Sequence, residues 1–412
     1  MTTRQRLDLL ARAYPRLFPR AELQRLLRAQ LGHVDALDSW VERDGSHAHT
    51  WVRARAPKII YHICAGNLAV SAWTSLAHGL LLGSHNIVKL PSERDDSTAR
   101  REILDFIRGL PKPLRKLVEV QKGSAVKVPQ QARSQVQLGN EGSASCALRA
   151  PGQQVARATQ AHSQALTEED KFGNDVLDRA DVIIAFGSDA TMSSLRAQLR
   201  WDQKFIAHGH AVSLLWLAAP NRLTVRQARA CAVDVLTYDQ LGCLSPQAIY
   251  VPNGTDLESV GRKLAHALET HWQGLAKKPA RPLSVAARIA EARDVAHALG
   301  HRVWLPPKNH LRWTLIHHPD PEFQPSPLHG VIYLRQTSEA KLSTALASVT
   351  GRISTIGTIG QISKHLEQIF LGLGVSRFCA AGRMQFPPLT WHHDGRSSLA
   401  DLVTWIDFEN PT

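Results

Sequence analysis

The chain has 412 residues, of which 43% are hydrophobic, and a formal net charge of +13. This length allows two or more domains, and the hydrophobic content excludes a globally disordered chain. The positive charge favours anionic partners such as a phosphorylated cofactor, a nucleotide-bearing substrate, an acidic carrier protein or nucleic acid. Arginines are spread throughout without a dense basic run, which argues against a nucleic-acid-binding protein.

The cysteines indicate reduced thiols rather than a disulfide framework, because no two of them form a CxxC pair. They are Cys64, Cys146, Cys231, Cys243 and Cys379. The first residues lack the apolar core of a signal peptide, and no apolar run reaches the roughly 18 residues of a membrane-spanning helix. We therefore expect a soluble cytoplasmic protein.

The first half of the chain predicts strands alternating with helices. Two amphipathic packing helices are expected within residues 4–32, followed by a strand at 58–63, a helix ending at Gly83 and a strand at 86–90. This order is typical of a βαβ unit, whose ligands bind at the carboxyl ends of parallel strands, and Lys89 lies at such an end. A helix is expected over 99–110, then a loosely ordered insertion over 121–166 that is rich in Gln, Ser, Ala and Gly.

After this insertion, the sequence predicts a helix around 168–178 and a buried strand at 181–186, then Gly187, Ser188 and a helix for which Thr191 is the expected N-cap. Strands at 204–206 and 212–217 precede a helix over 224–239. Cys243 then lies on a turn before the strand Gln247–Val251, where a thiol can meet a substrate while it is held rigidly. Helices at 257–269 and 282–299, a strand at 331–334 and an amphipathic helix in the tail complete the prediction.

Four segments and the tail resemble a known family. YHICAGNLAVSAWTSLAHGLLLGSHNIVKLPS, AFGSDATMSSLR, FIAHGHAVSLLWL and YDQLGCLSPQAIYV are similar, in order and spacing, to the aldehyde dehydrogenase superfamily. The tail GVSRFCAAGRMQFPPLTWHHDGRSSLADLVTWIDFE resembles that of its long-chain acyl-CoA reductase (LuxC) family, which supplies fatty aldehyde in bacterial luminescence. The resemblance covers residues 55–412 apart from 121–166.

The resemblance implies an oxidoreductase that converts a fatty acyl thioester to an aldehyde through an acyl-cysteine. Cys243 would attack the thioester and release CoA, because acyl exchange between two sulfurs is near thermoneutral. Asn67 would stabilise the oxyanion together with the backbone N–H of Cys243. His208 stands where hydrolytic relatives carry a Glu, which disfavours hydrolysis, and either His208 or His210 would supply a proton.

The resemblance also implies the cofactor contacts. Lys89 would bind the adenosine ribose of a dinucleotide, and Gly187 and Ser188 would form the turn that approaches the pyrophosphate. Ser92 stands where NAD-preferring relatives often carry Glu, so we expect NADPH. His392, His393 and Asp394 are interpreted as structural parts of the tail, and no metal site is expected, because sequence neighbours rarely converge on one ion.

The expected fold class is α/β, aldehyde-dehydrogenase-like, with two parallel-sheet domains and the active site in the cleft between them. N-terminal helices occupy 1–54, a dinucleotide-binding domain 55–210, a catalytic thiol domain 211–390, and a C-terminal element 391–412 returns to the core or to an oligomer interface. Expected partners are a fatty acyl-CoA or acyl-protein, an acyl-protein synthetase or acyl carrier protein, and further copies of the chain. The alternatives are an NAD(P)-dependent aldehyde dehydrogenase and a non-catalytic scaffold or nucleic-acid-binding protein.

Overall fold

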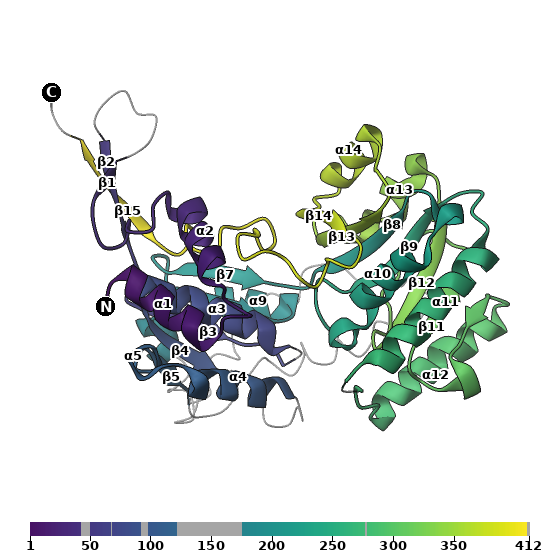
Figure 1. Cartoon of the computed structure of the whole chain (residues 1–412), viewed down its shortest axis with the longest axis horizontal. Coiled ribbons are helices and arrows are strands. Elements are labelled where there is room, and N and C mark those ends of the chain that lie inside the picture. Colours follow the sequence, from purple (N-terminus) through teal and green to yellow (C-terminus); the bar gives the residue numbers. More distant parts are fainter. Residues whose placement is uncertain (43–49, 67, 92–97, 122–174, 277, 410–412) are drawn as a thin grey trace, which may run out of the picture. The chain divides into compact units, whose positions relative to one another are not determined.

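The computed structural model describes residues 1–42, 50–66, 68–91, 98–121, 175–276 and 278–409, and it contains two compact units (Figure 1). Unit 1 comprises Met1–Arg20, Gly32–Gly209 and Leu402–Thr412, whereas unit 2 comprises Ala21–Leu31 and His210–Asp401. None of the helices in the described ranges is long and apolar enough to cross a membrane. The expected insertion at 121–166 and the expected helix at 168–178 lie outside the described residues, except for Gln121 and 175–178.

Unit 1 is organised around a parallel sheet that, within the described residues, has five strands in the order β5-β4-β3-β6-β7. The central strands are buried, as expected where helices cover a parallel sheet on both faces. Because all five strands are parallel, their carboxyl ends meet at one edge. The strands are β3 (Ile59–Ile63), β4 (His85–Lys89), β5 (Val118–Val120), β6 (Val182–Phe186) and β7 (Lys204–His208).

The helices in the first part of the described chain lie at the predicted positions, except for α5 (Lys112–Arg115), which the sequence did not predict. The others are α1 (Thr3–Ala13), α2 (Arg20–Leu31), α3 (Ala69–Leu82), α4 (Thr98–Gly109) and α9 (Asp189–Arg196). Helix α2 belongs to unit 2 from Ala21 onward. Helix α3 ends at Gly83 with φ 80°, which confirms the predicted left-handed cap. The prediction of Thr191 as the N-cap of α9 is wrong. Ser188 has the extended backbone of an N-cap, and its hydroxyl accepts from the Thr191 N–H at 3.2 Å.

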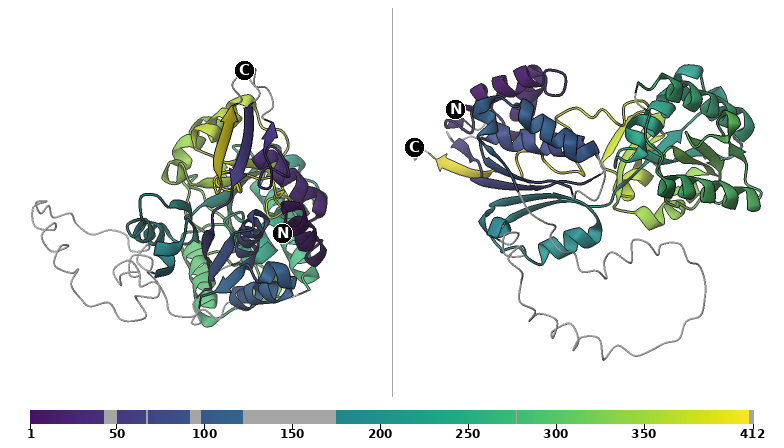
Figure 2. Two further views of the ribbon diagram at one scale, coloured as in Figure 1. Left: turned by 90° about the vertical axis from the view of Figure 1, so that its left-hand side faces the viewer. Right: turned by 90° about the horizontal axis from the view of Figure 1, so that it is seen from below.

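The tail does not form the predicted amphipathic helix. It forms strand β15 (Thr404–Glu409), which pairs antiparallel with β2 (Thr50–Arg55), and β1 (Val41–Glu42) completes this second sheet of unit 1. Figures 1 and 2 show yellow β15 alongside purple β2. Leu399, Leu402 and Val403 are buried, but they precede the strand, whereas every residue of β15 is exposed. Apolar spacing therefore predicted the wrong element, because backbone pairing with a remote strand decides it.

Unit 2 contains a sheet in the order β10-β11-β12-β9-β8-β13-β14 across the part of the chain that the structure describes. Only β10 is antiparallel to its neighbour. The predicted strand after Cys243 is confirmed as β9, which is the central strand of this sheet. The strands are β8 (Val212–Leu217), β9 (Pro246–Pro252), β10 (Val303–Trp304), β11 (Thr314–His317), β12 (Val331–Thr337), β13 (Ile353–Ile359) and β14 (Arg377–Ala380).

Both faces of this sheet are buried, because alternate residues of β8 and β9 belong to different cores (Figure 1). Leu215 and Ile249 pack with α10 (Val225–Leu236) and α11 (Leu257–Gly274). Leu214 and Tyr250 pack on the other face with α13 (Glu339–Ala345) and α14 (Lys364–Gly372). Helix α12 (Leu283–Ala298) packs against the β11–β12 end. The 3-10 helices are η2 (Pro220–Arg222), η3 (Thr237–Gln240), η4 (Pro307–Asn309) and η5 (Ala347–Val349).

Two glycines of α11 give opposite expectations for substitution by alanine. A Cβ at Gly261 would lie 2.2 Å from Cζ2 of Trp304, whereas a Cβ at Gly274 meets nothing within 4 Å. We expect Gly261→Ala to destabilise the protein by about 1–3 kcal/mol, because a rigid ring must move. Gly274→Ala should be neutral or stabilise by up to about 1 kcal/mol through the unfolded chain. Urea unfolding measures both, and equal effects would contradict the packing described for α11.

Candidate active site

The Cys243 loop joins α10 to β9 in unit 2. Helix α10 starts with a capping box between Thr224 and Gln227 and is followed directly by η3. Three consecutive residues of η3, Tyr238, Asp239 and Gln240, have positive φ angles of 56°, 54° and 62°. Left-handed backbone in residues other than glycine costs roughly 1–3 kcal/mol each, so this segment needs strong anchors.

Asp239 supplies the first anchor. Its carboxylate accepts two hydrogen bonds from Arg281 at 2.8 and 2.9 Å and lies 2.5 Å from Nδ1 of His329. The side chains of Asp239 and Arg281 are only 10% and 14% exposed, so this ion pair is largely removed from water. His329 itself has a φ of 56°, and the cluster therefore locks two left-handed segments together.

Gln240 and two serines supply the other anchors of the loop. The Gln240 side chain donates to the carbonyls of Pro246 and Val331 at 2.8 and 2.9 Å, and it accepts from the Gly330 N–H at 2.9 Å. On the Cys243 side of the loop, the Ser213 hydroxyl donates to the Cys243 carbonyl at 2.7 Å, and the Ser245 N–H donates to the Gly242 carbonyl at 2.9 Å. Cys243 is therefore exposed on a backbone that is fixed on both sides, as the sequence predicts.

A buried network joins this loop to the segment after β14. The Asp234 carboxylate accepts from the backbone N–H groups of Gly382 and Met384. Gln385 donates to both the Asp234 carbonyl and the Ser245 hydroxyl at 3.0 Å. Burial raises the pKa of Asp234 to about 6, although these backbone donors oppose the shift. The Cys243 loop and the chain leading into the tail thus belong to one connected body.

His393 lies beside the thiol, and the sequence interpretation missed it. Its Nε2 is 3.9 Å from Sγ of Cys243, and its ring stacks on Trp391 with centroids 4.7 Å apart. His392, by contrast, lies beside Gln30, with their Nε2 atoms 3.4 Å apart. The interpretation of all three tail residues as structural did not include this contact of His393 with the thiol. The adjacent pair His392-His393 was visible, but the 150 residues that separate His393 from Cys243 concealed the contact.

The surroundings of the Cys243 thiol raise its pKa. Desolvation is the largest cause that raises its pKa, to about 12, and the negative charge of Asp394 acts in the same direction. Cys243 is exposed, whereas Cys64 and Cys231 are buried, so the Cys243 thiol keeps part of its hydration. Both causes oppose a resting thiolate, so nucleophilic attack requires a base to remove the proton.

Unit 1 places Lys89 and His208 at the carboxyl edge of its parallel sheet. Lys89 ends β4, and its carbonyl accepts from the Cys64 N–H at 3.1 Å. Burial lowers the pKa of the Lys89 ammonium to about 8. His208 ends β7, where its ring stacks on Phe186 at 4.7 Å and its carbonyl accepts from the Gly187 N–H at 3.2 Å.

Gly187 and Ser188 connect β6 to α9 at the same edge. The predicted strand–turn–helix junction is present, and the Ser188 hydroxyl caps the helix through Thr191. A helix N-terminus beside the ends of parallel strands favours a phosphate group. Asp189, in the first turn of α9, adds a negative charge that acts against such binding. Asn67 and Ser92 lie outside the described residues, so their predicted roles stay predictions.

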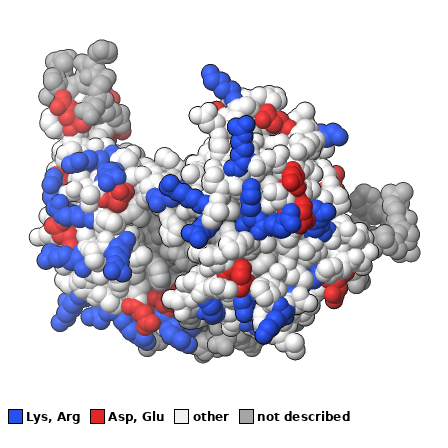
Figure 3. Space-filling model, turned by 45° about the vertical axis from the view of Figure 1, so that its right-hand side comes forward, with Lys and Arg blue, Asp and Glu red and all other residues white. Residues whose placement is uncertain are grey.

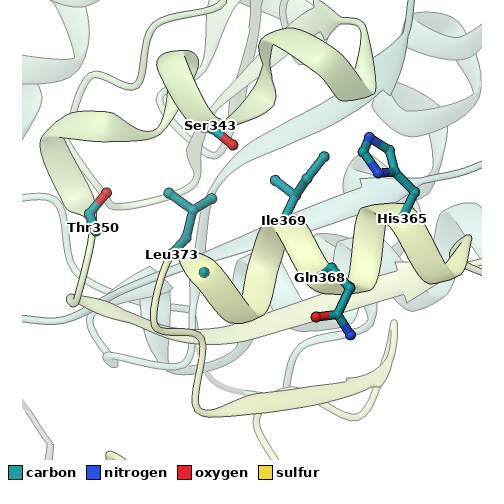
Figure 4. Close-up of a pocket in the computed structure, with 7 residues that line it drawn as sticks. Ser343, Thr350, His365, Gln368, Ile369 and Leu373 are labelled. Carbon is teal, nitrogen blue, oxygen red and sulfur yellow. The ribbon is translucent and has the colours of Figure 1, made fainter.

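A pocket of about 470 Å³ lies elsewhere in unit 2. Figure 4 shows His365, Gln368 and Ile369 on α14 and Ser343 on α13, and Thr350, Gly372 and Leu373 complete the lining. The pocket shares no lining residue with the Cys243 loop and contains no thiol or carboxylate. This pocket is therefore separate from the Cys243 loop.

The surface charges are dispersed, as the spread of arginines along the sequence predicts. Figure 3 shows Lys and Arg side chains spread over one face, with Asp and Glu among them. A protein that grips nucleic acid concentrates its cations in a patch or stripe along the contact. This face has no such concentration within the described residues.

Solved structures define the class of fold. A lactaldehyde dehydrogenase matches 100% of this chain and 87% of its own length, with a TM-score of 0.62 and 12% identity. A glyceraldehyde-3-phosphate dehydrogenase from Methanocaldococcus jannaschii, solved with NADP, matches 99% of this chain and 90% of its own length, with a TM-score of 0.61 and 11% identity. The fold is of the aldehyde dehydrogenase type, and the predicted α/β class is confirmed.

The family within this class follows from the sequence. The family model described as acyl-CoA reductase (LuxC) matches residues 2–127 and 163–405, and the chain belongs to that family. A long-chain acyl-protein thioester reductase from Aliivibrio fischeri is 22% identical over 404 residues, which are 96% of this chain and 72% of that protein. The resemblance recognised from the sequence is thereby confirmed, as is the reductase class. The family match is interrupted between 127 and 163, within the segment predicted to be an insertion.

Proposed function

We propose that this chain reduces a fatty acyl thioester to the fatty aldehyde, with NADPH as reductant and an acyl group carried on Cys243. The observation that carries the proposal is the exposed Cys243 thiol on a doubly anchored loop, in a chain of the acyl-CoA reductase family. The acyl donor is CoA or a protein, and the name of the Aliivibrio fischeri relative favours acyl-protein. An acyl-protein synthetase or acyl carrier protein is the corresponding partner. We further propose a cytoplasmic homo-oligomer.

In the proposed reaction, unit 2 supplies the nucleophile and unit 1 supplies the cofactor contacts. In unit 2, Sγ of Cys243 attacks the acyl carbon, and the donor sulfur leaves. Asn67 and the backbone N–H of Cys243 are proposed to stabilise the oxyanion, for which one such donor contributes about 3–4 kcal/mol. Lys89, Gly187 and Ser188 would hold the nicotinamide cofactor, which would supply the hydride for release of the acyl group as aldehyde. His208 or His210 is proposed to donate the proton required by the leaving thiolate or the aldehyde oxygen.

The residues of unit 1 suit a dinucleotide. Lys89 offers an ammonium at the strand edge, where burial lowers its pKa and an acceptor from a ribose or phosphate would restore its charge. The N–H groups at the start of α9 and the Gly187 backbone suit a pyrophosphate. Ser92 in place of an acidic residue supports NADPH over NADH. On this proposal unit 1 is the dinucleotide-binding domain and unit 2 the catalytic thiol domain.

The alternative enzyme is an aldehyde dehydrogenase that works in the oxidative direction. It needs a base that activates water, and His208, whose ring stacks on Phe186, replaces the usual Glu. The two enzymes differ in their products, because the oxidative enzyme releases a fatty acid. The non-catalytic alternative predicts no nicotinamide binding and a DNA affinity that falls steeply with salt.

Product analysis tests the proposal. Purified protein is incubated with tetradecanoyl-CoA, or with tetradecanoyl-acyl carrier protein, and with NADPH or NADH, and the products are quantified by mass spectrometry. We expect tetradecanal in a 1:1 ratio to oxidised NADPH, and the better donor identifies the substrate class. Release of tetradecanoic acid without cofactor oxidation, or reaction only with tetradecanal and NADP⁺ as substrates, would contradict the reductase assignment.

Lys89 should make NADPH binding depend on pH. Its free-state pKa is about 8, and a bound acceptor favours the ammonium form, so affinity should be highest below pH 8 and fall as the pH rises above it. We expect Lys89→Met to raise the NADPH dissociation constant about tenfold or more and to remove this dependence, because hydrogen bonds to charged groups contribute about 1.5–3 kcal/mol. Calorimetric titration at pH 7 and pH 9 measures both effects. Lys58→Met, an exposed lysine just before β3, is the control and should bind as wild type.

A further inference from the structure

The contact between His393 and Cys243 joins two segments of unit 2 that are far apart in sequence. Sγ of Cys243 and Nε2 of His393 are 3.9 Å apart, and both residues belong to the body that extends from His210 to Asp401. Thiol–imidazole distances are often longer before substrate binds than in the reacting complex. The separation therefore suits a proton transfer that a bound substrate tightens.

Local structure holds the imidazole in place. His393 lies in a tight turn in which the Gly395 N–H donates to the His392 carbonyl at 3.1 Å and the Arg396 N–H donates to the His393 carbonyl at 3.0 Å. Asp394 and Gly395 have positive φ angles of 52° and 75°, which close the turn. The ring stacks on Trp391, so it has few orientations available.

Trp391 in turn is tied to the body that holds the Cys243 loop. The Arg377 guanidinium lies 5.5 Å from the centroid of the Trp391 ring and donates to the carbonyls of Arg383 and Met384 at 2.9 Å. The Met384 N–H donates to Asp234, whose carbonyl is bound by Gln385, and Gln385 also binds Ser245 of the Cys243 loop. Imidazole and thiol are therefore positioned by one network rather than by two independent loops.

The charged groups around Cys243 and His393 favour a neutral thiol and a protonated imidazole. The Asp394 carboxylate is 3.6 Å from Nε2 of His393, where it favours an imidazolium, and it also disfavours a thiolate at Cys243. The Arg377 guanidinium lies over the Trp391 ring on which His393 stacks, and Arg396 contacts His393 through its backbone. A carboxylate that opposes the thiolate and stabilises the imidazolium suits proton removal during attack rather than a preformed ion pair.

We propose that His393 is the general base that activates Cys243. This inference rests on the proposed function, in which Cys243 receives the acyl group. The Cys243 S–H proton passes to Nε2 of His393 while Sγ forms a bond to the acyl carbon. The bond between the acyl carbon and the donor sulfur breaks, and the donor leaves as a thiol with the proton returned by the imidazolium. On this proposal, the proton from His208 or His210 goes to the aldehyde oxygen and not to the leaving thiolate. No electrons are gained or lost in this exchange, and Asp394 stabilises the transient imidazolium.

Two reactions of Cys243 test the proposal across pH 5.5–10. The first is acylation by tetradecanoyl-CoA without NADPH, followed as mass added to the protein. The second is alkylation by iodoacetamide, which reports thiol activation without any acyl chemistry. Because an imidazole titrates near neutral pH, both wild-type rates should rise through the neutral range. Both reactions should be slower in His393→Gln than in wild type, by on the order of 100-fold at pH 7. The difference between the two proteins should shrink at alkaline pH, where the thiol ionises without a base.

Controls separate a base from a structural residue. His392→Gln changes the neighbouring histidine and should retain the wild-type pH profile. Added imidazole should partly restore the acylation and alkylation rates of His393→Ala. Thermal melting shows whether each variant is folded. A His393→Gln profile parallel to that of wild type, or an absence of imidazole rescue in folded His393→Ala, would overturn the proposal. If wild-type Cys243 gains no acyl group, the proposed function fails instead, and the alkylation profiles still decide whether His393 activates the thiol.

Discussion

Cys243→Ala is expected to lower kcat/KM for aldehyde formation by a factor on the order of 10⁴ or more, because covalent catalysis is lost together with its nucleophile. Two of the other described thiols cannot replace it. Cys64 and Cys231 are buried, and burial raises the pKa of both thiols well above its usual value. NADPH binding should be unchanged, since the proposed cofactor contacts belong to unit 1. Steady-state aldehyde formation and calorimetric NADPH titration measure the two expectations.

Cys379→Ala is the matched control for that loss. Cys379 lies on β14 and is partly exposed, so it is the second most accessible described thiol. Burial raises its pKa to about 11. We expect the variant to retain near wild-type aldehyde formation. Retained activity in Cys243→Ala together with its loss in Cys379→Ala would move the nucleophile to β14.

Asp239→Ala is expected to destabilise the protein by about 3–5 kcal/mol, because it leaves the largely buried Arg281 cation without its carboxylate. It also releases the left-handed backbone of Tyr238, Asp239 and Gln240, whose strain the ion pair supports. In the fraction that remains folded, iodoacetamide should alkylate Cys243 more slowly than in wild type, since the Asp239 ion pair holds one side of the loop. Urea unfolding and alkylation kinetics measure the two effects.

An exposed ion pair of the same unit provides the comparison. Glu258 and Arg302 approach to 3.0 Å, but their side chains are 40% and 52% exposed. Glu258→Ala should therefore change stability by no more than about 1 kcal/mol and leave alkylation of Cys243 unchanged. If Asp239→Ala lost as little stability as Glu258→Ala, the Asp239 cluster would not hold the loop.

Local sequence patterns predicted most of the fold, because apolar runs, turn residues and glycines indicate where its helices and strands begin and end. Apolar runs bounded by turn residues predicted strands such as β6 and β9, and a glycine marked the end of α3 at Gly83. The tail was the exception. The helical spacing of Leu399, Leu402 and Val403 reflects burial without a helix, and Thr404–Glu409 becomes a strand only because Thr50–Arg55 lies beside it. No periodicity in the tail carries information about that distant partner.

The candidate site was predictable only in part, for the same reason. Cys243 and Lys89 stand next to recognisable strands, so their placement followed from the chain order. The contact of Cys243 with His393 depends on a tail turn held through Trp391, Arg377 and Asp234, which are far from one another in the sequence. The left-handed segment at Tyr238–Gln240 was also hidden, because none of its residues is a glycine.

The central claim is that Cys243 carries the acyl group between thioester and aldehyde. The most direct measurement is intact-protein mass spectrometry after incubation with mass-tagged tetradecanoyl-CoA, before and after addition of NADPH, for wild type and Cys243→Ala. We predict that wild type gains one tetradecanoyl group on Cys243, that NADPH discharges it as tetradecanal, and that Cys243→Ala gains none. Equal labelling of the two proteins, or a wild-type label that NADPH does not discharge, would contradict the account.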